Sequence, residues 1–231
     1  SVVKRAMDVL SCLRGHKNDV NDLAFGGSHD TLVSASDESV RMWDLDKART
    51  SRCFLPTSAQ DSHVDGDELS VNCVTWGYGA FLDVVAFGVG RSFLLFDSRE
   101  PQLVSKCPKH SFINEHTDEV NHLCFQFDGS LLAAADDSGD IILYDLRMMN
   151  IFKKLKRKHS NICTKVLFRP GKPADLISGG LDGQLLHWNI NKGKPLNSYD
   201  MIEAEATVSI GCQASCTFFI SEQNAKYSRV F

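Results

Sequence analysis

Residues 176–189, with the sequence LISGGLDGQLLHWN, decide the fold of this 231-residue chain. An apolar stretch leads into small residues, an Asp-Gly turn follows, and a second apolar stretch ends on Trp188 and Asn189. Short apolar and aromatic runs separated by turns of Gly, Asp and Ser are typical of β-strands. Before this stretch come His159 and then an apolar run that ends at Phe168. The unit therefore predicts a small antiparallel sheet.

The same order of features returns four times along the chain. Each unit opens on a His and closes on an aromatic residue followed by Asp or Asn. The closing aromatics are residues 43, 96, 144 and 188, at intervals of 53, 48 and 44 residues. A repeat of about 40–45 residues with loop insertions is the period of a four-stranded propeller blade. The sequence therefore predicts an all-β propeller. The opening residues are His16, His63, His116 and His159.

The repeat resembles the WD-repeat family in its Gly-His opening at residues 15–16, its Ser-x-x-x-Asp-Gly turn at residues 178–183 and its Trp-Asp closing at residues 43–44. The resemblance covers nearly the whole chain and is strongest in the first and fourth units. It implies a WD-repeat β-propeller with four recognisable blades and a partial fifth. The blades are expected at residues 14–57, 58–105, 106–154, 155–198 and 199–231.

Seven such blades would need roughly 300 residues, so we expect the chain to be a fragment of a seven-bladed ring or a shortened isoform. In the family, an N-terminal segment can supply the outermost strand of the closing blade. Residues 1–13 are a candidate for that strand.

In this family the opening His, a strand Ser, the turn Asp and the closing Trp form a buried hydrogen-bonded chain within each blade. The resemblance implies such chains in two units: His16, Ser34, Asp37 and Trp43 in the first, and His159, Ser178, Asp182 and Trp188 in the fourth. The third unit departs from the pattern, with Ala133 in place of the Ser and Tyr144 in place of the Trp. The second unit has Phe96 as its closing aromatic. We expect the second and third blades to depend more on apolar packing.

An Arg stands two residues after the closing Asp in the second and third units. The two motifs are Phe96-Asp97-Ser98-Arg99 and Tyr144-Asp145-Leu146-Arg147. A doubled Trp-Asp-x-Arg motif resembles the docking signature of substrate receptors of cullin–RING ubiquitin ligases. The resemblance implies that Phe96, Asp97, Arg99, Tyr144, Asp145 and Arg147 bind the damage-specific DNA-binding adaptor of those ligases. The alternative is that both Arg residues are solvated strand-end residues paired with Asp97 and Asp145.

Two charged segments stand out in a chain whose formal net charge is only −4. Such a mild balance argues against a dedicated nucleic-acid binder. Residues 153–158, KKLKRK, carry five charges, which fits a nuclear-import signal, a nucleic-acid patch or an outer strand whose Lys residues discourage edge-to-edge pairing. Residues 58–69 carry four acids and are expected to form a solvated loop, because the ligand spacing of an EF-hand is absent.

The sequence predicts no catalytic site, no cofactor and no metal. GVG at residues 88–90 lacks the third Gly of a phosphate-binding loop, and the chain has no G-x-S-x-G motif. The eight Cys residues form no CxxC pair and are expected to be free thiols. No apolar run approaches the roughly 18–20 residues that a membrane span needs. With no signal-peptide pattern at Ser1–Ser11 either, we expect an intracellular protein, cytoplasmic or nuclear.

The function hypothesis that follows is a non-catalytic protein-interaction scaffold, and more specifically a substrate receptor of a cullin–RING ubiquitin ligase. One alternative is a generic WD-repeat scaffold or peptide reader in a nuclear or chromatin complex. The other is an RNA- or DNA-associated factor that uses the Lys153–Lys158 run.

Overall fold

The computed structural model describes residues 11–26, 30–54, 70–99, 115–127, 130–155 and 159–200, and the backbone of residues 208–213, 217–222 and 229–230. Within these residues the regular secondary structure is β-strand, apart from a single 3-10 turn, η1 (Gly79–Phe81). Residues 1–13 were predicted as a possible closing strand. Residues 1–10 lie outside the described residues, and residues 11–13 are not in a strand. His63, the acidic segment at residues 58–69 and Lys156–Lys158 also lie outside the description.

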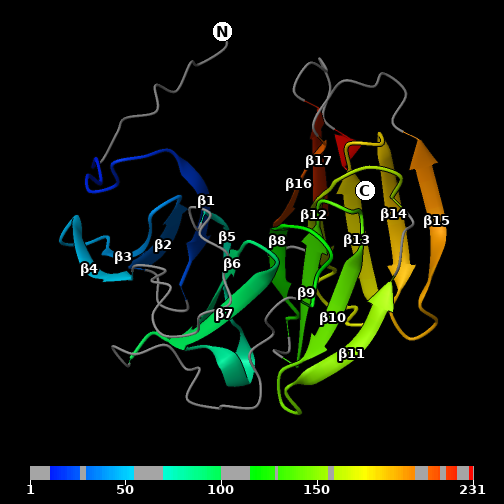
Figure 1. The fold of residues 1–231 in the computed structure, drawn as a ribbon, viewed down its shortest axis with the longest axis horizontal. Coiled ribbons are helices and arrows are strands. Elements are labelled where there is room, and N and C mark those ends of the chain that lie inside the picture. Colours follow the sequence, from blue (N-terminus) through cyan, green and yellow to red (C-terminus); the bar gives the residue numbers. More distant parts are fainter. Residues whose placement is uncertain are drawn as a thin grey trace, which may run out of the picture.

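The described strands form five antiparallel sheets that follow one another along the chain (Figure 1). Blade 1 contains β1 (Val20–Phe25), β2 (Thr31–Ser36), β3 (Ser39–Asp44) and β4 (Arg49–Phe54). Blade 2 contains β5 (Val71–Trp76), β6 (Val84–Val89) and β7 (Ser92–Asp97). Blade 3 contains β8 (Val120–Phe125), β9 (Leu131–Asp136), β10 (Ile141–Asp145) and β11 (Asn150–Leu155). Blade 4 contains β12 (Cys163–Phe168), β13 (Asp175–Gly180), β14 (Gln184–Asn189) and β15 (Lys194–Asp200), and the partial blade 5 contains β16 (Val208–Gln213), β17 (Thr217–Glu222) and β18 (Arg229–Val230).

Each sheet is a meander in which every strand pairs with the strand that follows it in the sequence. The first strands share one irregularity, because the pairing register shifts after the first residue of β1, β5, β8 and β12. One β-bulge at the same place in four sheets is the structural counterpart of the sequence repeat. The predicted all-β propeller blades, four recognisable and a fifth partial, are confirmed.

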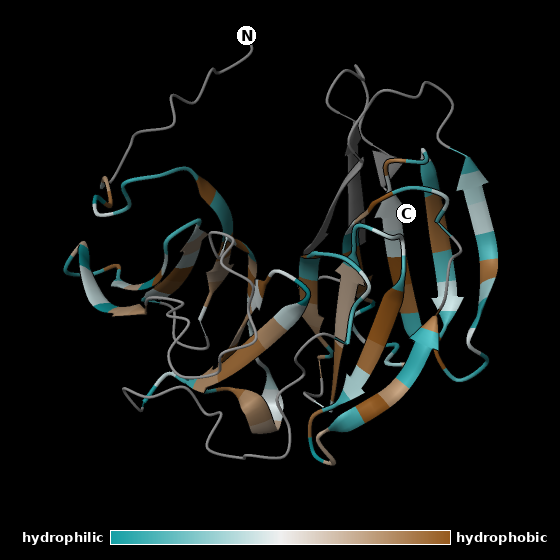
Figure 2. Ribbon diagram, in the orientation of Figure 1, coloured by the Kyte–Doolittle hydropathy of each residue, from teal (hydrophilic) through white to brown (hydrophobic). Residues whose placement is uncertain are grey.

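The apolar core lies between neighbouring blades. Val33 and Met42 of blade 1 belong to one buried cluster with Phe87 of blade 2. Phe93 of blade 2 meets Tyr144 of blade 3 with ring centroids 4.8 Å apart, and a third cluster joins blades 3 and 4. Figure 2 shows hydrophobic residues along the central strands, while the outermost strands β4, β11 and β15 alternate in polarity. Each blade is therefore held by its neighbours.

Because the strands alternate in direction, the loops that follow each first and each third strand lie on the same side of the molecule. We call this side the exit face. It includes residues 45–48 after β3, residues 98–99 after β7, residues 146–149 after β10 and residues 190–193 after β14. The turn between β10 and β11 is visible at the lower edge of Figure 1. The exit face therefore carries both Asp-x-Arg motifs.

Candidate functional site

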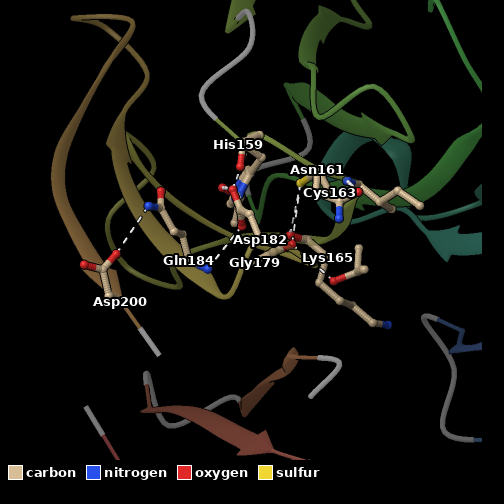
Figure 3. A network of polar contacts seen from close by, with 12 residues as sticks. His159, Asn161, Cys163, Lys165, Gly179, Asp182, Gln184 and Asp200 are labelled. Atoms are coloured by element: carbon tan, nitrogen blue, oxygen red, sulfur yellow. Dashed lines mark hydrogen bonds and ion pairs between the residues drawn. The ribbon is translucent and has the colours of Figure 1, made fainter. Parts of the chain in front are cut away.

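Blade 4 contains a hydrogen-bonded chain that runs from its opening loop to its third strand. His159 lies with Nδ1 3.0 Å from Oδ1 of Asp182 and with Nε2 2.7 Å from the Ser178 hydroxyl. Trp188 Nε1 donates to the same hydroxyl at 2.8 Å. Figure 3 shows the His159 imidazole facing Asp182, with Gln184 reaching toward Asp200. The chain joins the loop before β12 to β13, its turn and β14, so it fixes the register of the blade.

Blade 1 has the same arrangement with a different fourth member. His16 Nε2 lies 2.5 Å from the Ser34 hydroxyl, to which Trp43 Nε1 donates at 2.8 Å. The prediction that Asp37 completes the chain is wrong, because His16 Nδ1 is 3.2 Å from the hydroxyl of Ser39. The turn of this blade is one residue shorter than in blade 4, so Ser39, the first residue of β3, takes the place of a turn Asp.

The Asp37 carboxylate joins blade 1 to blade 2. It accepts hydrogen bonds from Asn21 at 2.7 Å and from Ser70 at 3.3 Å. Asn21 also donates to the carbonyl of Val71 at 3.0 Å. This acid therefore serves the contact between blades and not the internal chain of blade 1.

Blade 3 keeps a His–Asp contact but supplies its Asp from a different place. His116 Nδ1 lies 2.8 Å from Oδ2 of Asp136, and both side chains are fully buried. Asp136 pairs with the first residue of β8, as Gly180 pairs with the first residue of β12, so the two occupy equivalent positions. Burial by itself raises the pKa of Asp136, but hydrogen bonds from His116 and Ser138 outweigh it and hold the pKa below its usual range.

The residue that replaces the chain Ser in blade 3 is Ala134, which corrects the assignment to Ala133. Trp188 pairs with Leu176, two residues before Ser178. Tyr144 pairs with Leu132, so the equivalent position is Ala134. With a methyl group there, Nε2 of His116 is buried and has no hydrogen-bond partner among the residues that the structure describes.

The two aromatic residues of the Asp-x-Arg motifs are core residues. Phe96 and Tyr144 have no exposed surface. The Phe96 ring lies 4.2 Å from that of Phe54 and 5.7 Å from that of Phe87, measured between centroids. A docked protein reaches only surface atoms, so the expectation that Phe96 and Tyr144 contact an adaptor is wrong. They instead support the strands that carry the Asp and Arg residues.

Arg99 is held by acids of its own blade. Its guanidinium donates from Nε to Asp97 Oδ1 at 2.9 Å and from Nη2 to Asp97 Oδ2 at 2.5 Å. Nη1 lies 3.2 Å from Asp83, and 69% of the Arg99 side chain is exposed. The hydrogen bond from Arg99 holds the pKa of Asp97 below its usual range. Arg99 is thus an exposed strand-end residue paired with Asp97, as the alternative hypothesis states.

Arg147 differs, although its motif matches that of Arg99. The Asp145 carboxylate accepts from the backbone N–H of Arg147 at 2.9 Å and of Met148 at 3.0 Å, which fixes the turn. Arg147 is exposed, and its guanidinium has no hydrogen bond or ion pair with any described residue. Met148 beside it is 67% exposed. Arg147 therefore presents on the exit face five donors that no described residue occupies.

The described part of the Lys153–Lys158 run makes contacts within the protein. Lys153 Nζ donates to the carbonyls of Ile190 at 2.9 Å and Asn191 at 2.8 Å, which joins blade 3 to blade 4. Lys154 Nζ lies 3.4 Å from Glu115. Lys153 is therefore occupied by the contact between blades.

The described residues contain no cluster of three or more His, Cys, Asp or Glu side chains arranged to hold a metal ion. Nor do they include a helix long and apolar enough to cross a membrane. Two thiols, Cys73 and Cys163, are buried, and this burial raises the pKa of both. Thiols in that state are poor nucleophiles.

Two family models match this chain. The WD domain, G-beta repeat, matches residues 7–44, and the anaphase-promoting complex subunit 4 WD40 domain matches residues 82–169. The matches fall on blade 1 and on the segment from β6 to the end of β12.

Several curated proteins are similar in sequence to this chain over most of its length. The WD repeat-containing protein 53 homolog of Dictyostelium discoideum is 27% identical over 186 residues, which are 80% of this chain and 47% of the relative. Residues 130–190 also resemble that type in their own sequence. Histone acetyltransferase type B subunit 2 of Candida glabrata is 26% identical over 84% of the chain and 44% of the relative. Pre-rRNA-processing protein IPI3 of Yarrowia lipolytica is 28% identical over 70% of this chain and 40% of the relative. The chain thus spans less than half the length of these relatives.

Proposed function

We propose that this chain is a WD-repeat protein-interaction scaffold and that its exit face docks the adaptor of a cullin–RING ubiquitin ligase, with Arg147 as the main contact. The chain would then act as a substrate receptor, with other surfaces left for the substrate protein. The observation that carries this proposal is the exposed guanidinium of Arg147, which has no partner among the described residues. A planar guanidinium with five donors suits a carbonyl-rich or carboxylate-bearing partner, and Arg is enriched at interface hot spots.

The two motifs are expected to contribute unequally. Arg99 must give up its two hydrogen bonds to Asp97 before it can bind a partner. Arg147 has no bond to a described residue to give up, so docking through it avoids that cost. The Asp145 carboxylate supports Arg147 indirectly, because it fixes the turn from which the side chain extends.

The test is a binding measurement with the purified ligase adaptor and the full chain, by biolayer interferometry. We expect Arg147→Ala to weaken binding at least tenfold and Arg99→Ala to weaken it less. Arg91→Ala is the matched control, because Arg91 is an exposed Arg in the β6–β7 turn on the opposite face. No binding by the wild type, or binding that Arg147→Ala leaves unchanged, would contradict adaptor docking.

A second candidate function is a generic scaffold or peptide reader in a nuclear or chromatin complex. It is favoured by the similarity to histone acetyltransferase type B subunit 2. Both candidates act inside the cell, in the cytoplasm or the nucleus. An RNA- or DNA-associated role is less well supported, because Lys153 is engaged with blade 4 and Lys154 lies beside Glu115.

A further inference from the structure

An open groove of about 560 Å³ lies between blades 1 and 2 on the exit face. Its acidic residues come from three loops: Asp30 before β2, Asp44 and Asp46 at the end of β3 and its turn, and Asp83 before β6. Its apolar wall includes Trp43, Trp76 and Leu82. The groove therefore combines a carboxylate rim with an apolar wall.

Two of the four carboxylates form no ion pair with a described residue. Asp44 pairs with Lys47 at 2.7 Å, and Asp83 pairs with Arg99 at 3.2 Å. The carboxylates of Asp30 and Asp46 are exposed and have no ion pair or hydrogen bond with the residues that the structure describes. The groove therefore has an excess of negative charge, which favours a cationic occupant and repels an acidic one.

An exposed aromatic pair lies on the same exit face, in the loops that follow β5 and β8. The rings of Tyr78 and Phe127 stack with centroids 5.2 Å apart and an interplanar angle of 21°, although the residues are 43% and 57% exposed. Tyr78 and Leu82 flank the η1 turn, and Leu82, itself 45% exposed, lines the groove. We call Tyr78, Phe127 and Leu82 the aromatic ledge. An exposed apolar surface of this kind beside charged residues is typical of a protein-binding site.

We propose that the groove and the aromatic ledge together bind a peptide segment of a partner protein that carries an Arg side chain and, a few residues away, a large apolar side chain. The Arg stem packs against the apolar wall while its guanidinium reaches Asp30 and Asp46, an arrangement that long cationic side chains adopt readily. The apolar side chain lies on the ledge. The inference rests on the scaffold role of the chain but not on adaptor docking.

The experiment uses fluorescein-labelled 12-residue peptides in a Gly-Ser background, each with one Arg and one Phe separated by one to six residues. Fluorescence polarisation with the full chain measures their dissociation constants. At the best spacing we expect binding at least tenfold tighter than that of matched peptides in which citrulline replaces Arg or Ser replaces Phe. Binding is also expected to weaken as NaCl rises from 50 to 500 mM, because the rim is exposed.

Variants of the chain assign the binding to its parts. The double variant Asp30→Asn, Asp46→Asn should weaken binding at least tenfold and abolish the preference for Arg over citrulline. The double variant Tyr78→Ser, Phe127→Ser should abolish the preference for Phe over Ser. Glu38→Gln is the control, because Glu38 is an exposed acid in the β2–β3 turn on the other face.

The proposal is overturned if no peptide binds more tightly than the plain Gly-Ser peptide, or if the double Asp variant binds as the wild type does. Adaptor docking is scored separately. The Asp30→Asn, Asp46→Asn variant should still bind the adaptor, and Arg147→Ala should still bind the peptide. Failure of one binding activity therefore leaves the other to be judged on its own result.

Discussion

His116 and Asp136 form a hydrogen-bonded pair from which solvent is fully excluded: Nδ1 lies 2.8 Å from Oδ2, and neither side chain has exposed surface. Blade 4 makes the corresponding contact through Asp182, a turn residue. Blade 3 makes it through the last residue of β9. The acid that contacts the opening His can therefore come either from the end of the second strand or from the turn that follows it.

Replacing Asp136 by Ala should destabilise the chain by about 3–5 kcal/mol, because it leaves the buried His116 without the carboxylate that it shares with the half-buried Ser138. Urea denaturation followed by circular dichroism at pH 7.5 measures the change. Asp118→Ala, an exposed acid in the loop before β8, is the control and should change stability by less than about 0.5 kcal/mol. A loss of under about 1 kcal/mol in the Asp136 variant would contradict this account.

Ala134→Ser should stabilise the chain by about 1 kcal/mol, because the new hydroxyl would give Nε2 of His116 a partner, which no described residue supplies. Ala133→Ser is the matched control. Both Ala residues lie in buried apolar clusters, but the pairing register places only position 134 where a hydroxyl would meet His116, so the change at Ala133 should destabilise. The free energies of unfolding of both variants decide the point. Equal effects would mean that the register does not distinguish the two sites.

Stability should fall below pH 6.5 through His122. Burial, followed by the charge of Lys165, lowers the pKa of His122 to about 3. Between that value and 6.5 the unfolded chain binds a proton that the folded chain does not, so the free energy of unfolding drops as the pH is lowered. The contribution is about 1.4 kcal/mol per pH unit, or about 2 kcal/mol between pH 6.5 and pH 5.0. Urea titrations of wild type and His122→Gln test this, and parallel pH profiles would rule it out.

Lys153→Gln should destabilise the chain by about 1–3 kcal/mol, because it removes two charge-assisted hydrogen bonds to blade 4 carbonyls. Lys154→Gln should cost less than about 0.5 kcal/mol, since its contact with Glu115 is long and exposed. Thermal melts of both variants provide the comparison. If the two Lys variants lose the same stability, Lys153 does not join the blades as the structure indicates.

Much of the fold could be predicted from the sequence because the repeat motif consists of residues that determine turns and strands locally. The closing aromatics Trp43, Phe96, Tyr144 and Trp188 all lie at the ends of third strands and are all buried. Turn chemistry and strand alternation are short-range properties. Because the motif recurs four times, the same turns and strands are predicted four times.

The finer geometry depends on pairing register and on loops far apart in the sequence, which a motif does not encode. Ala133 and Ala134 are neighbours in a run of three Ala residues, and only the pairing of Tyr144 with Leu132 separates their roles. Arg99 and Arg147 follow similar motifs, yet among the described residues an acid from another loop, Asp83, lies within reach of Arg99 and none lies within reach of Arg147. The groove between blades 1 and 2 was not predicted for the same reason.

The buried clusters of this molecule each belong to two blades, so the sequence of one blade is constrained by the sequences on either side of it. Such a chain behaves as a one-dimensional series of coupled units, in which the energy of a junction counts as much as that of a unit. A blade transplanted from another protein would have to match two foreign surfaces at once. Exchanging adjacent blades as a pair would preserve one native junction, so pairs are the natural modules for recombination in this chain.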